Sequence, residues 1–375
     1  MNASSALRYI ASLTIIFLIA GCATDSNNNN TAEHESISSP QYWSLLGQNT
    51  DTLQPDISTR VRLIDEQGKS VVTEEMESVY NGQAVRFQDG FLTTTRTDFI
   101  LLSKSGSETD RIPHSDHSIL TDIKSSENNQ AVAIVFNEGF GPLKAGNVLY
   151  LQTQDRQARA ESNYFPLALT VCDDGNLFWV DRDANQALAK SLSIDGRQTE
   201  MQIPLQPSET IDGIFDCNRK SLDLVIQSGP ATQKVRIANP LDSPQLEFRE
   251  TVDKLWPLEV PRGSQMLGQG LLTVKRDGSF QLIDTEPTVP TIEGKFNIGE
   301  GMVISATFDD PLVSIDFITP QDGETNIATF RISKPNESNA LTKIPRSAFI
   351  DKNDIQDDFN GSRNIGSVFI LDKER

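Results

Sequence analysis

Residues 188–204 read LAKSLSIDGRQTEMQIP, and residues 99–113 read FILLSKSGSETDRIP. Each segment has an aliphatic run, a turn that contains glycine and a second run that ends in Ile-Pro. Two short runs joined by such a turn predict a β-hairpin. Both hairpins lie downstream of an Asp-Gly pair, Asp89-Gly90 and Asp174-Gly175 respectively. The same order, a tight turn followed by a hairpin, occurs twice in the sequence, which indicates a structural repeat.

The chain from residue 41 onward shows the same pattern throughout. No amphipathic helical period persists, whereas short alternating or apolar runs bounded by Gly, Asp and Asn recur. The runs predict strands at residues 84–87, 91–95, 99–103, 131–136, 167–172, 177–181, 222–227, 271–275, 280–284, 313–318 and 367–371. The predicted fold class is therefore all-β.

The spacing of the predicted turns suggests the architecture. Candidate turns fall at Asp89-Gly90, Asn128-Asn129, Asp174-Gly175, Asn218-Arg219, Asp277-Gly278, Asp309-Asp310 and Asn360-Gly361, with a mean spacing of about 45 residues. A repeat of that length with four short strands has the size of a β-propeller blade. We predict one propeller of about seven blades over residues 41–375. A multi-sheet β-sandwich array, which also spaces short strands evenly, is the alternative.

The two ends of this body complement each other. Residues 60–73, RVRLIDEQGKSVVT, have the shape of the outer hairpin but no inner hairpin before them. Residues 367–371 begin a repeat that the chain does not finish. We therefore predict that N- and C-terminal strands share the last blade and close the ring.

No known propeller family is indicated by motifs. The Gly-His and Trp-Asp signatures of WD repeats are absent, and three tryptophans are too few for quinoprotein-like blades. Residues 171–178, VCDDGNLF, resemble the sialidase Asp-box in part through Asp173, Gly175 and Phe178. Val171 and Leu177 replace its Ser and Thr, so this segment is interpreted as an ordinary strand, turn and strand.

The N-terminal segment has the layout of an export signal. Arg8 precedes an apolar run over residues 9–20, which is shorter than the roughly 20 residues that a membrane-spanning helix needs. Ile19-Ala20-Gly21-Cys22 then resembles the lipobox of bacterial lipoproteins. The resemblance implies a signal peptide over residues 1–21 and palmitate-type acyl chains on Cys22, which anchor the protein to a membrane. An ordinary secretory signal, which would leave a soluble protein, is the alternative.

Residues 22–40 are expected to form a lipidated, disordered tether. The segment is rich in Asn, Ser, Thr and Glu, and Ile37 is its only large apolar residue after the lipobox. A flexible chain over residues 23–40 has a reach of about 21 to 25 Å. We expect an extracytoplasmic body, on the outer membrane of a two-membrane bacterium or the outer face of a single plasma membrane.

Composition restricts the partners. The formal net charge is -19, and no Lys/Arg-rich run is present. Nucleic acid is therefore not expected as a partner, because its recognition rewards clustered positive charge. We expect a neutral or basic protein partner in the cell envelope.

Candidate catalytic and metal-binding residues are few. No G-x-S-x-G elbow, Walker loop or H-E-x-x-H helix is present, and no catalytic residue is assigned. His114 and His117 have zinc-ligand spacing, but a solvated loop between blades is the favoured interpretation. Asp181, Asp183 and Asn185 are weak calcium candidates, because Gln186 and Leu192 stand where that loop needs Gly and Glu. A second acidic cluster comprises Asp351, Asp354, Asp357 and Asp358. No cofactor is expected beyond the acyl chains on Cys22.

Two further cysteines occupy similar positions in the predicted repeat. Cys172 and Cys217 each precede a candidate turn, 45 residues apart, so each would occupy the same place in successive blades. An exported protein meets an oxidising environment, so we predict a disulfide between them.

These features favour a non-enzymatic, lipid-anchored scaffold or binding module. Two alternatives stay open at the level of sequence. One is an extracytoplasmic hydrolase or lyase that uses carboxylates in a channel, and the other is a capture protein for glycans or small molecules.

Overall fold

The computed structural model describes most of the chain after the predicted tether. The described residues are 39–48, 58–77, 79, 82–117, 119–139, 146–164, 166–182, 186–204, 209–217, 220–228, 231–252, 264–267, 270–284, 291–309, 312–319, 325–331, 342–350 and 363–371. Ser36–Arg375 form one compact unit. In the described ranges the one helical element is the short η1 (Arg346–Ala348), and no helix there has the length and apolar character needed to cross a membrane.

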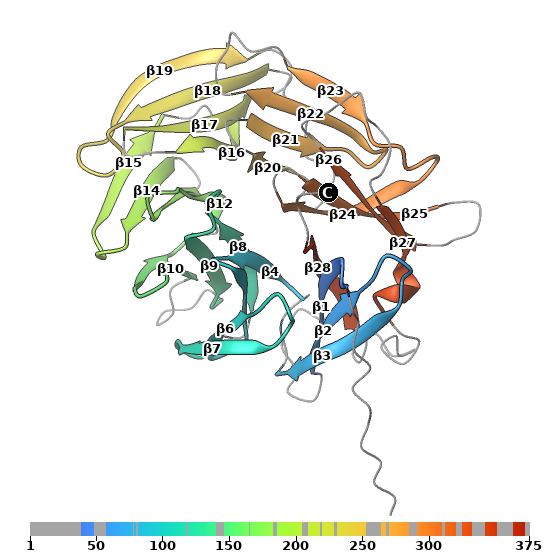
Figure 1. The fold of residues 1–375 in the computed structure, drawn as a ribbon. Helices are drawn as coiled ribbons and strands as arrows, with labels where there is room; N and C mark the ends of the chain where they lie inside the picture. Colours follow the sequence, from blue (N-terminus) through green and yellow to red (C-terminus); the bar gives the residue numbers. More distant parts are fainter. Residues whose placement is uncertain are drawn as a thin grey trace, which may run out of the picture. The chain divides into compact units, whose positions relative to one another are not determined.

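Seven four-stranded antiparallel sheets form a ring, as Figure 1 shows. The first three sheets contain β4 (Ala84–Phe87), β5 (Gly90–Thr94), β6 (Asp98–Leu102) and β7 (Glu108–Pro113); β8 (Leu120–Ser125), β9 (Ala131–Asn137), β10 (Asn147–Thr153) and β11 (Gln157–Ser162); and β12 (Pro166–Val171), β13 (Asn176–Arg182), β14 (Ala187–Ser193) and β15 (Gln198–Ile203). The next two contain β16 (Glu209–Cys217), β17 (Ser221–Ser228), β18 (Ala231–Ala238) and β19 (Gln245–Val252); and β20 (Ser264–Leu267), β21 (Gly270–Val274), β22 (Ser279–Asp284) and β23 (Ile292–Lys295). The sixth contains β24 (Met302–Asp309), β25 (Leu312–Ile318), β26 (Thr325–Arg331) and β27 (Thr342–Pro345). This is a seven-bladed β-propeller, as the sequence predicts.

The seventh blade joins the two ends of the propeller, and we call it the seam blade. Its order is β28 (Arg363–Ile370), β1 (Tyr42–Gln48), β2 (Thr59–Ile64) and β3 (Ser70–Met76). β28 pairs antiparallel with β1, with Trp43 opposite Phe369. The predicted closure of the ring is confirmed, and residues 60–73 form the outer two strands of this blade.

The predicted hairpins occupy the expected place in their blades. Residues 99–113 form β6 and β7, and residues 188–204 form β14 and β15, the outer two strands of their blades. All the strands predicted from the sequence are present, with shifts of a few residues at their ends. Two of the predicted turns do not join the first and second strands of a blade. Asp277-Gly278 joins the second and third strands of its blade. Asn360-Gly361 precedes β28 in the sequence and lies outside the described residues. The connection between the first and second strands of the fifth blade lies at residues 268–269, outside the described residues. Counting this connection in place of Asp277-Gly278 makes the spacing of the turns more regular.

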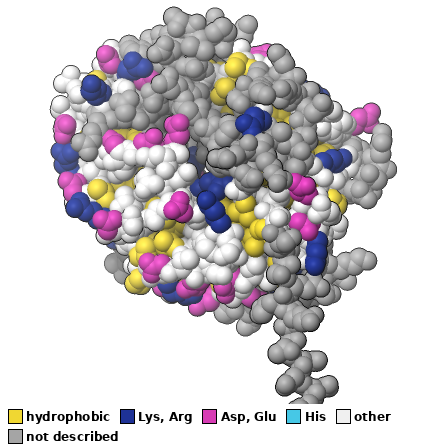
Figure 2. Space-filling model, viewed as in Figure 1, with side chains coloured by type: hydrophobic (Ala, Val, Ile, Leu, Met, Phe, Trp, Pro, Cys, Tyr) yellow, Lys and Arg dark blue, Asp and Glu magenta, His cyan; other side chains and the backbone are white. Residues whose placement is uncertain are grey.

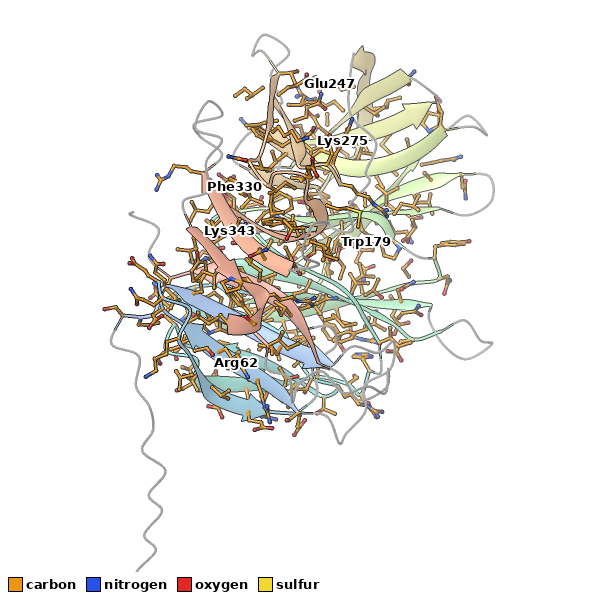
Figure 3. The ribbon with its side chains drawn as sticks, turned by 90° about the vertical axis from the view of Figure 1, so that its right-hand side faces the viewer. Arg62, Trp179, Glu247, Lys275, Phe330 and Lys343 are labelled. Atoms are coloured by element: carbon orange, nitrogen blue, oxygen red, sulfur yellow. The ribbon has the colours of Figure 1, made fainter. Side chains whose placement is uncertain are left out.

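The core lies between blades. Among the described residues, six hydrophobic clusters each combine residues from two neighbouring blades. Trp179 and Phe330, labelled in Figure 3, belong to two of them. A sheet packed on both faces needs apolar side chains on both faces. Residues 131–136 of β9 and residues 312–317 of β25 are accordingly buried without a break. This packing explains why several strands are continuous apolar runs rather than alternating ones.

A buried arginine links three blades at the seam. Arg86 on β4 donates two hydrogen bonds to the carboxylate of Asp309 on β24 and one to the carbonyl oxygen of Ile370 on β28. Its guanidinium carbon also lies 5.3 Å from the ring centre of Phe91 and 5.4 Å from that of Phe369. We call these contacts of Arg86 the seam clasp. They bridge β28 and the blades on either side of it.

Candidate functional site

The histidine pair predicted from the sequence lies in the connection from β7 to β8. His117 is only 3% exposed, and the ring of His114 stacks on it at 5.3 Å. The expectation that this connection is a solvated loop is therefore wrong for His117. Phe136 contacts both rings, because the connection folds back over the blade that follows it.

Both ring nitrogens of each imidazole have a hydrogen-bond partner. His117 donates from Nδ1 to Glu138, so its Nε2 accepts from the hydroxyl of Tyr150 at 2.8 Å. His114 Nε2 lies 3.0 Å from the hydroxyl of Thr94, and its Nδ1 lies 2.6 Å from the carbonyl oxygen of Ser115. With all four ring nitrogens engaged, the pair positions the β7–β8 connection.

Burial controls the charge of these histidines. It lowers the pKa of His114 to about 4 and also lowers the pKa of His117, although the bond to Glu138 opposes the second shift. Both imidazoles are therefore neutral at pH 7. Within the described ranges, no group of three His, Cys, Asp or Glu side chains is placed to hold a metal ion.

The calcium candidates are only partly described. Asp181, at the end of β13, is fully buried, and its Oδ2 lies 2.9 Å from the ammonium nitrogen of Lys190. A lysine partner competes with a cation for that carboxylate. The side chains of Asp183 and Asn185 lie outside the described residues, as do Cys22 and the acidic cluster from Asp351 to Asp358.

Cys172 follows β12 and is disulfide-bonded. Its side chain is buried in the cluster between the third and fourth blades. The side chain of Cys217 lies outside the described part of the chain, so the pairing of Cys172 with Cys217 stays a prediction.

Most of the buried carboxylates named so far have basic partners, but Asp316 differs. Asp223 receives two hydrogen bonds of 2.7 Å from Arg236, Asp181 pairs with Lys190, and Asp309 belongs to the seam clasp. Asp316 on β25 is 8% exposed, and its buried Oδ1 has no hydrogen-bond partner within the described residues. A buried acceptor left in this state is costly, and Oδ1 of Asp181 shares it within the described residues.

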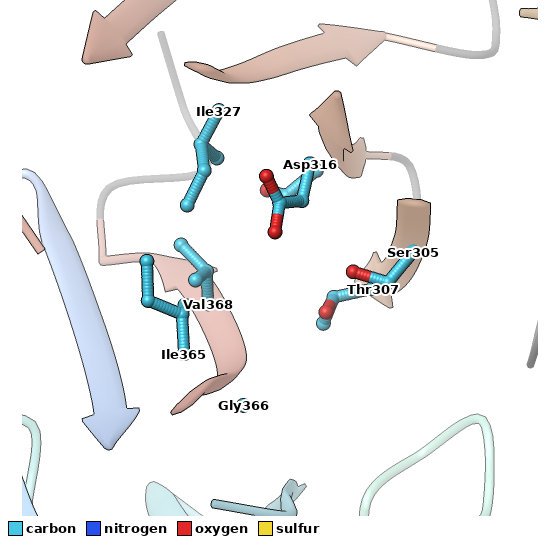
Figure 4. A pocket seen from close by; sticks show the side chains of 8 residues that line it. Ser305, Thr307, Asp316, Ile327, Ile365, Gly366 and Val368 are labelled. Atoms are coloured by element: carbon cyan, nitrogen blue, oxygen red, sulfur yellow. The ribbon is translucent and has the colours of Figure 1, made fainter. Parts of the chain in front are cut away.

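Asp316 lines a pocket between the sixth blade and the seam blade, shown in Figure 4. The pocket is small, with room for about one water molecule. Its polar wall carries the hydroxyls of Ser305, Thr307 and Ser314 beside the carboxylate, and its other wall carries Ile327, Ile365, Gly366 and Val368. We call it the Asp316 pocket.

Desolvation dominates the electrostatics of the pocket. Burial raises the pKa of Asp316 to about 6, although the positive charge of Arg346 opposes the shift. The carboxylate is thus largely ionised at pH 7 but easily protonated just below it. Sequence reasoning missed this site because Asp316 is a single acidic residue inside the apolar run LVSIDFI, which predicts only a buried strand.

The fold and these contacts define a closed seven-bladed β-propeller with a small polar pocket beside its seam. No protein-family model matches the chain, and no curated protein matches it. Among solved structures, the chain is similar to virginiamycin B lyase from Staphylococcus aureus, with 17% identity, 74% of this chain and 95% of that chain covered, and a TM-score of 0.42.

Two other similar structures come from fungi. One is the Cps50 (Swd1) β-propeller domain from Myceliophteria thermophila, with 8% identity, 72% and 89% of the two chains covered, and a TM-score of 0.46. The other is the Pan2 WD40 domain from Neurospora crassa, with 10% identity, 74% and 86% covered, and a TM-score of 0.43. Likenesses at this level concern the fold and carry no argument about activity.

Proposed function

We propose that this protein is a bacterial lipoprotein whose propeller acts outside the cytoplasm as a non-enzymatic scaffold or binding module. In this proposal Cys22 carries the lipid anchor, and residues 22–40 tether the propeller to the membrane. The observation that carries the proposal is the closed seven-bladed ring that follows the lipobox and tether sequence. Such a ring is a rigid platform that the tether holds near the membrane surface.

The disulfide bond of Cys172 supports an extracytoplasmic location. Disulfides persist in oxidising compartments and are rare in the cytosol. We propose Cys217 as its partner, because the cluster that buries Cys172 joins their two blades. Intact-protein mass spectrometry without reductant is expected to show no free thiol among these two cysteines.

The charge distribution indicates the kind of partner. Figure 2 shows acidic and basic side chains interspersed on the face seen in Figure 1. The formal net charge of -19 nevertheless makes the whole chain strongly acidic. A neutral or basic protein of the cell envelope is therefore the proposed partner, and nucleic acid is not.

A Cys22→Ala variant tests the anchor. Metabolic labelling with an alkyne analogue of palmitate is expected to label the wild-type chain and to leave the variant unlabelled. A Cys172→Ala variant is the matched control, because it removes a cysteine but keeps the lipobox. Label that persists on the Cys22→Ala chain would refute the lipoprotein assignment.

The Asp316 pocket gives no support to the alternative of a capture protein for small molecules, because it has room for only about one water molecule. A hydrolase or lyase also draws little support, because Asp181, Asp223 and Asp309 are engaged in ion pairs with Lys or Arg.

A further inference from the structure

The β7–β8 connection joins the first and second blades, and its two histidines anchor it to both. The backbone N–H of His114 also donates to the carbonyl oxygen of Thr97 at 2.7 Å, and that of His117 donates to the carbonyl oxygen of Arg96 at 2.8 Å. Asp116 forms an ion pair with Arg96, but both side chains are exposed, and such pairs contribute little to stability. The imidazoles therefore supply the buried polar contacts of this connection.

Aromatic side chains from both blades surround the imidazoles. The ring centre of Phe99 on β6 lies 4.4 Å from that of His114, and the ring centre of Phe136 on β9 lies 4.4 Å from that of His117. Tyr150 on β10 contacts both imidazoles, and all three aromatic side chains are buried. Detachment of the connection would expose part of this aromatic surface to water.

The charged groups around the histidine pair suit one protonated imidazole but not two. Glu138 accepts a hydrogen bond from Nδ1 of His117 and can balance a positive charge there. The other charged side chains that influence the pair are already engaged in ion pairs: Asp98 with Arg111, Asp116 with Arg96, and Arg159 with Glu161. Two imidazolium rings stacked at 5.3 Å among aromatic side chains would repel each other, and burial would deny them water.

We propose that the β7–β8 connection is an acid-released latch between the first and second blades. The latch is closed while the imidazoles are neutral, and it detaches when both take up a proton, so that Phe99 and Phe136 become accessible while the blades stay folded. The lowered pKa of each histidine has the required sign. The open connection binds protons more tightly than the closed one, so a fall in pH below 6.5 favours opening. This inference does not depend on the lipid anchor or on a protein partner.

Amide hydrogen exchange of the full chain, corrected for the intrinsic effect of pH on exchange, tests the latch. The amides of His114 and His117 report its opening, and the amide of Leu149 inside β10 reports the fold. Protection of the two latch amides is expected to fall at least tenfold between pH 7 and pH 5, because each proton taken up contributes up to about tenfold per pH unit. Protection of Leu149 is expected to change less than threefold. Unchanged latch amides, or an equal loss at Leu149, would overturn the proposal.

Two variants are expected to change the release in opposite directions. His114→Gln removes one titrating group, so its loss of protection between pH 7 and pH 5 should be at least threefold smaller than that of wild type. Glu138→Gln keeps an acceptor for His117 but removes the compensating charge, so its loss should be larger. His34→Gln, in the predicted tether, is the matched control and should behave like wild type. Equal losses in wild type, His114→Gln and Glu138→Gln would contradict the latch.

A second readout needs no variant. The chain has three histidines, so selective labelling of the imidazole carbons gives three NMR ring signals. His34 serves as the internal reference in the same sample. The signals of His114 and His117 are expected to titrate at lower pH than that of His34, and their titration should accompany the loss of protection at the latch amides. Ring signals that titrate together with His34 would overturn the proposal.

Discussion

Asp316 shows how one residue can lower stability at neutral pH. Its pKa is raised from 3.8 to about 6, so the folded protein holds the proton more tightly than the unfolded chain does. The contribution of Asp316 to stability is therefore full below pH 3.8 and is lost as pH rises through 6. Above that pH the folded state retains a desolvated carboxylate that has no ion-pair partner among the described residues.

An Asp316→Asn variant is expected to be more stable than wild type at pH 7.5, by about 1 to 3 kcal/mol. The amide has the same shape but carries no charge to desolvate. The gain should disappear near pH 4, where Asp316 itself is neutral. Chemical denaturation at both pH values measures the difference, with Glu247→Gln, which changes an exposed carboxylate on β19, as the control. A variant that loses stability at pH 7.5 would show that Asp316 is already paired.

At the scale of elements, the β7–β8 connection depends on neutral histidines. The pKa of His114 is lowered from 6.5 to about 4, so the unfolded chain takes up a proton in this range while the folded protein does not. This histidine therefore lowers the stability of the fold as pH falls from about 6.5 to 4. The lowered pKa of His117 acts in the same direction.

A His114→Gln variant is expected to lose less stability than wild type between pH 6.5 and pH 4. Glutamine cannot be protonated in this range and still offers a donor and an acceptor to Thr94 and Ser115. Urea unfolding at a series of pH values gives the slope of the free energy of unfolding against pH for each protein. Identical slopes for the two proteins would show that His114 is already solvated and titrates normally.

At the scale of elements, the regularity of a strand influences whether the sequence predicts it. Residues 99–113 and 188–204 are recognisable because an aliphatic strand, a Gly-containing turn and a strand that ends in Ile-Pro recur in both. Among the first strands of the blades, the sequence predicts β4, β12 and β28 but not β8, β16, β20 and β24. Register shifts interrupt the pairing of β8, β16 and β24, and such irregularities break the period of two on which strand prediction depends. This explanation does not cover β20, whose pairing with β21 is regular.

At the scale of the whole molecule, closure joins residues that are far apart in sequence. Arg86 and Asp309 are separated by 223 positions, so no local pattern indicates that they meet. The hairpin without an inner partner did predict the closure itself, because an incomplete repeat at each end leaves edges that must pair. The seam clasp and the Asp316 pocket are consequences of that closure, and only the folded ring brings their residues together.

An Arg86→Met variant tests the seam clasp. Losing the guanidinium leaves the carboxylate of Asp309 buried without this partner, which typically costs roughly 3 to 5 kcal/mol. Arg96→Met is the matched control, because Arg96 and Asp116 form an ion pair with side chains 48% and 62% exposed, and such pairs contribute about 0 to 1 kcal/mol. Equal effects of the two substitutions on the free energy of unfolding would contradict a stabilising clasp.

The thermal unfolding of a truncated chain tests ring closure most directly. A chain that ends at Ser362 lacks β28, which leaves β1 and the neighbouring blades with unpaired edges. A chain that ends at Leu371 keeps β28 and serves as the control. Closure predicts that the control melts like the full chain, whereas the shorter chain loses its single cooperative transition or melts far lower and aggregates. A melting temperature for the shorter chain within a few degrees of the full-length protein would contradict a ring closed by its terminal strands.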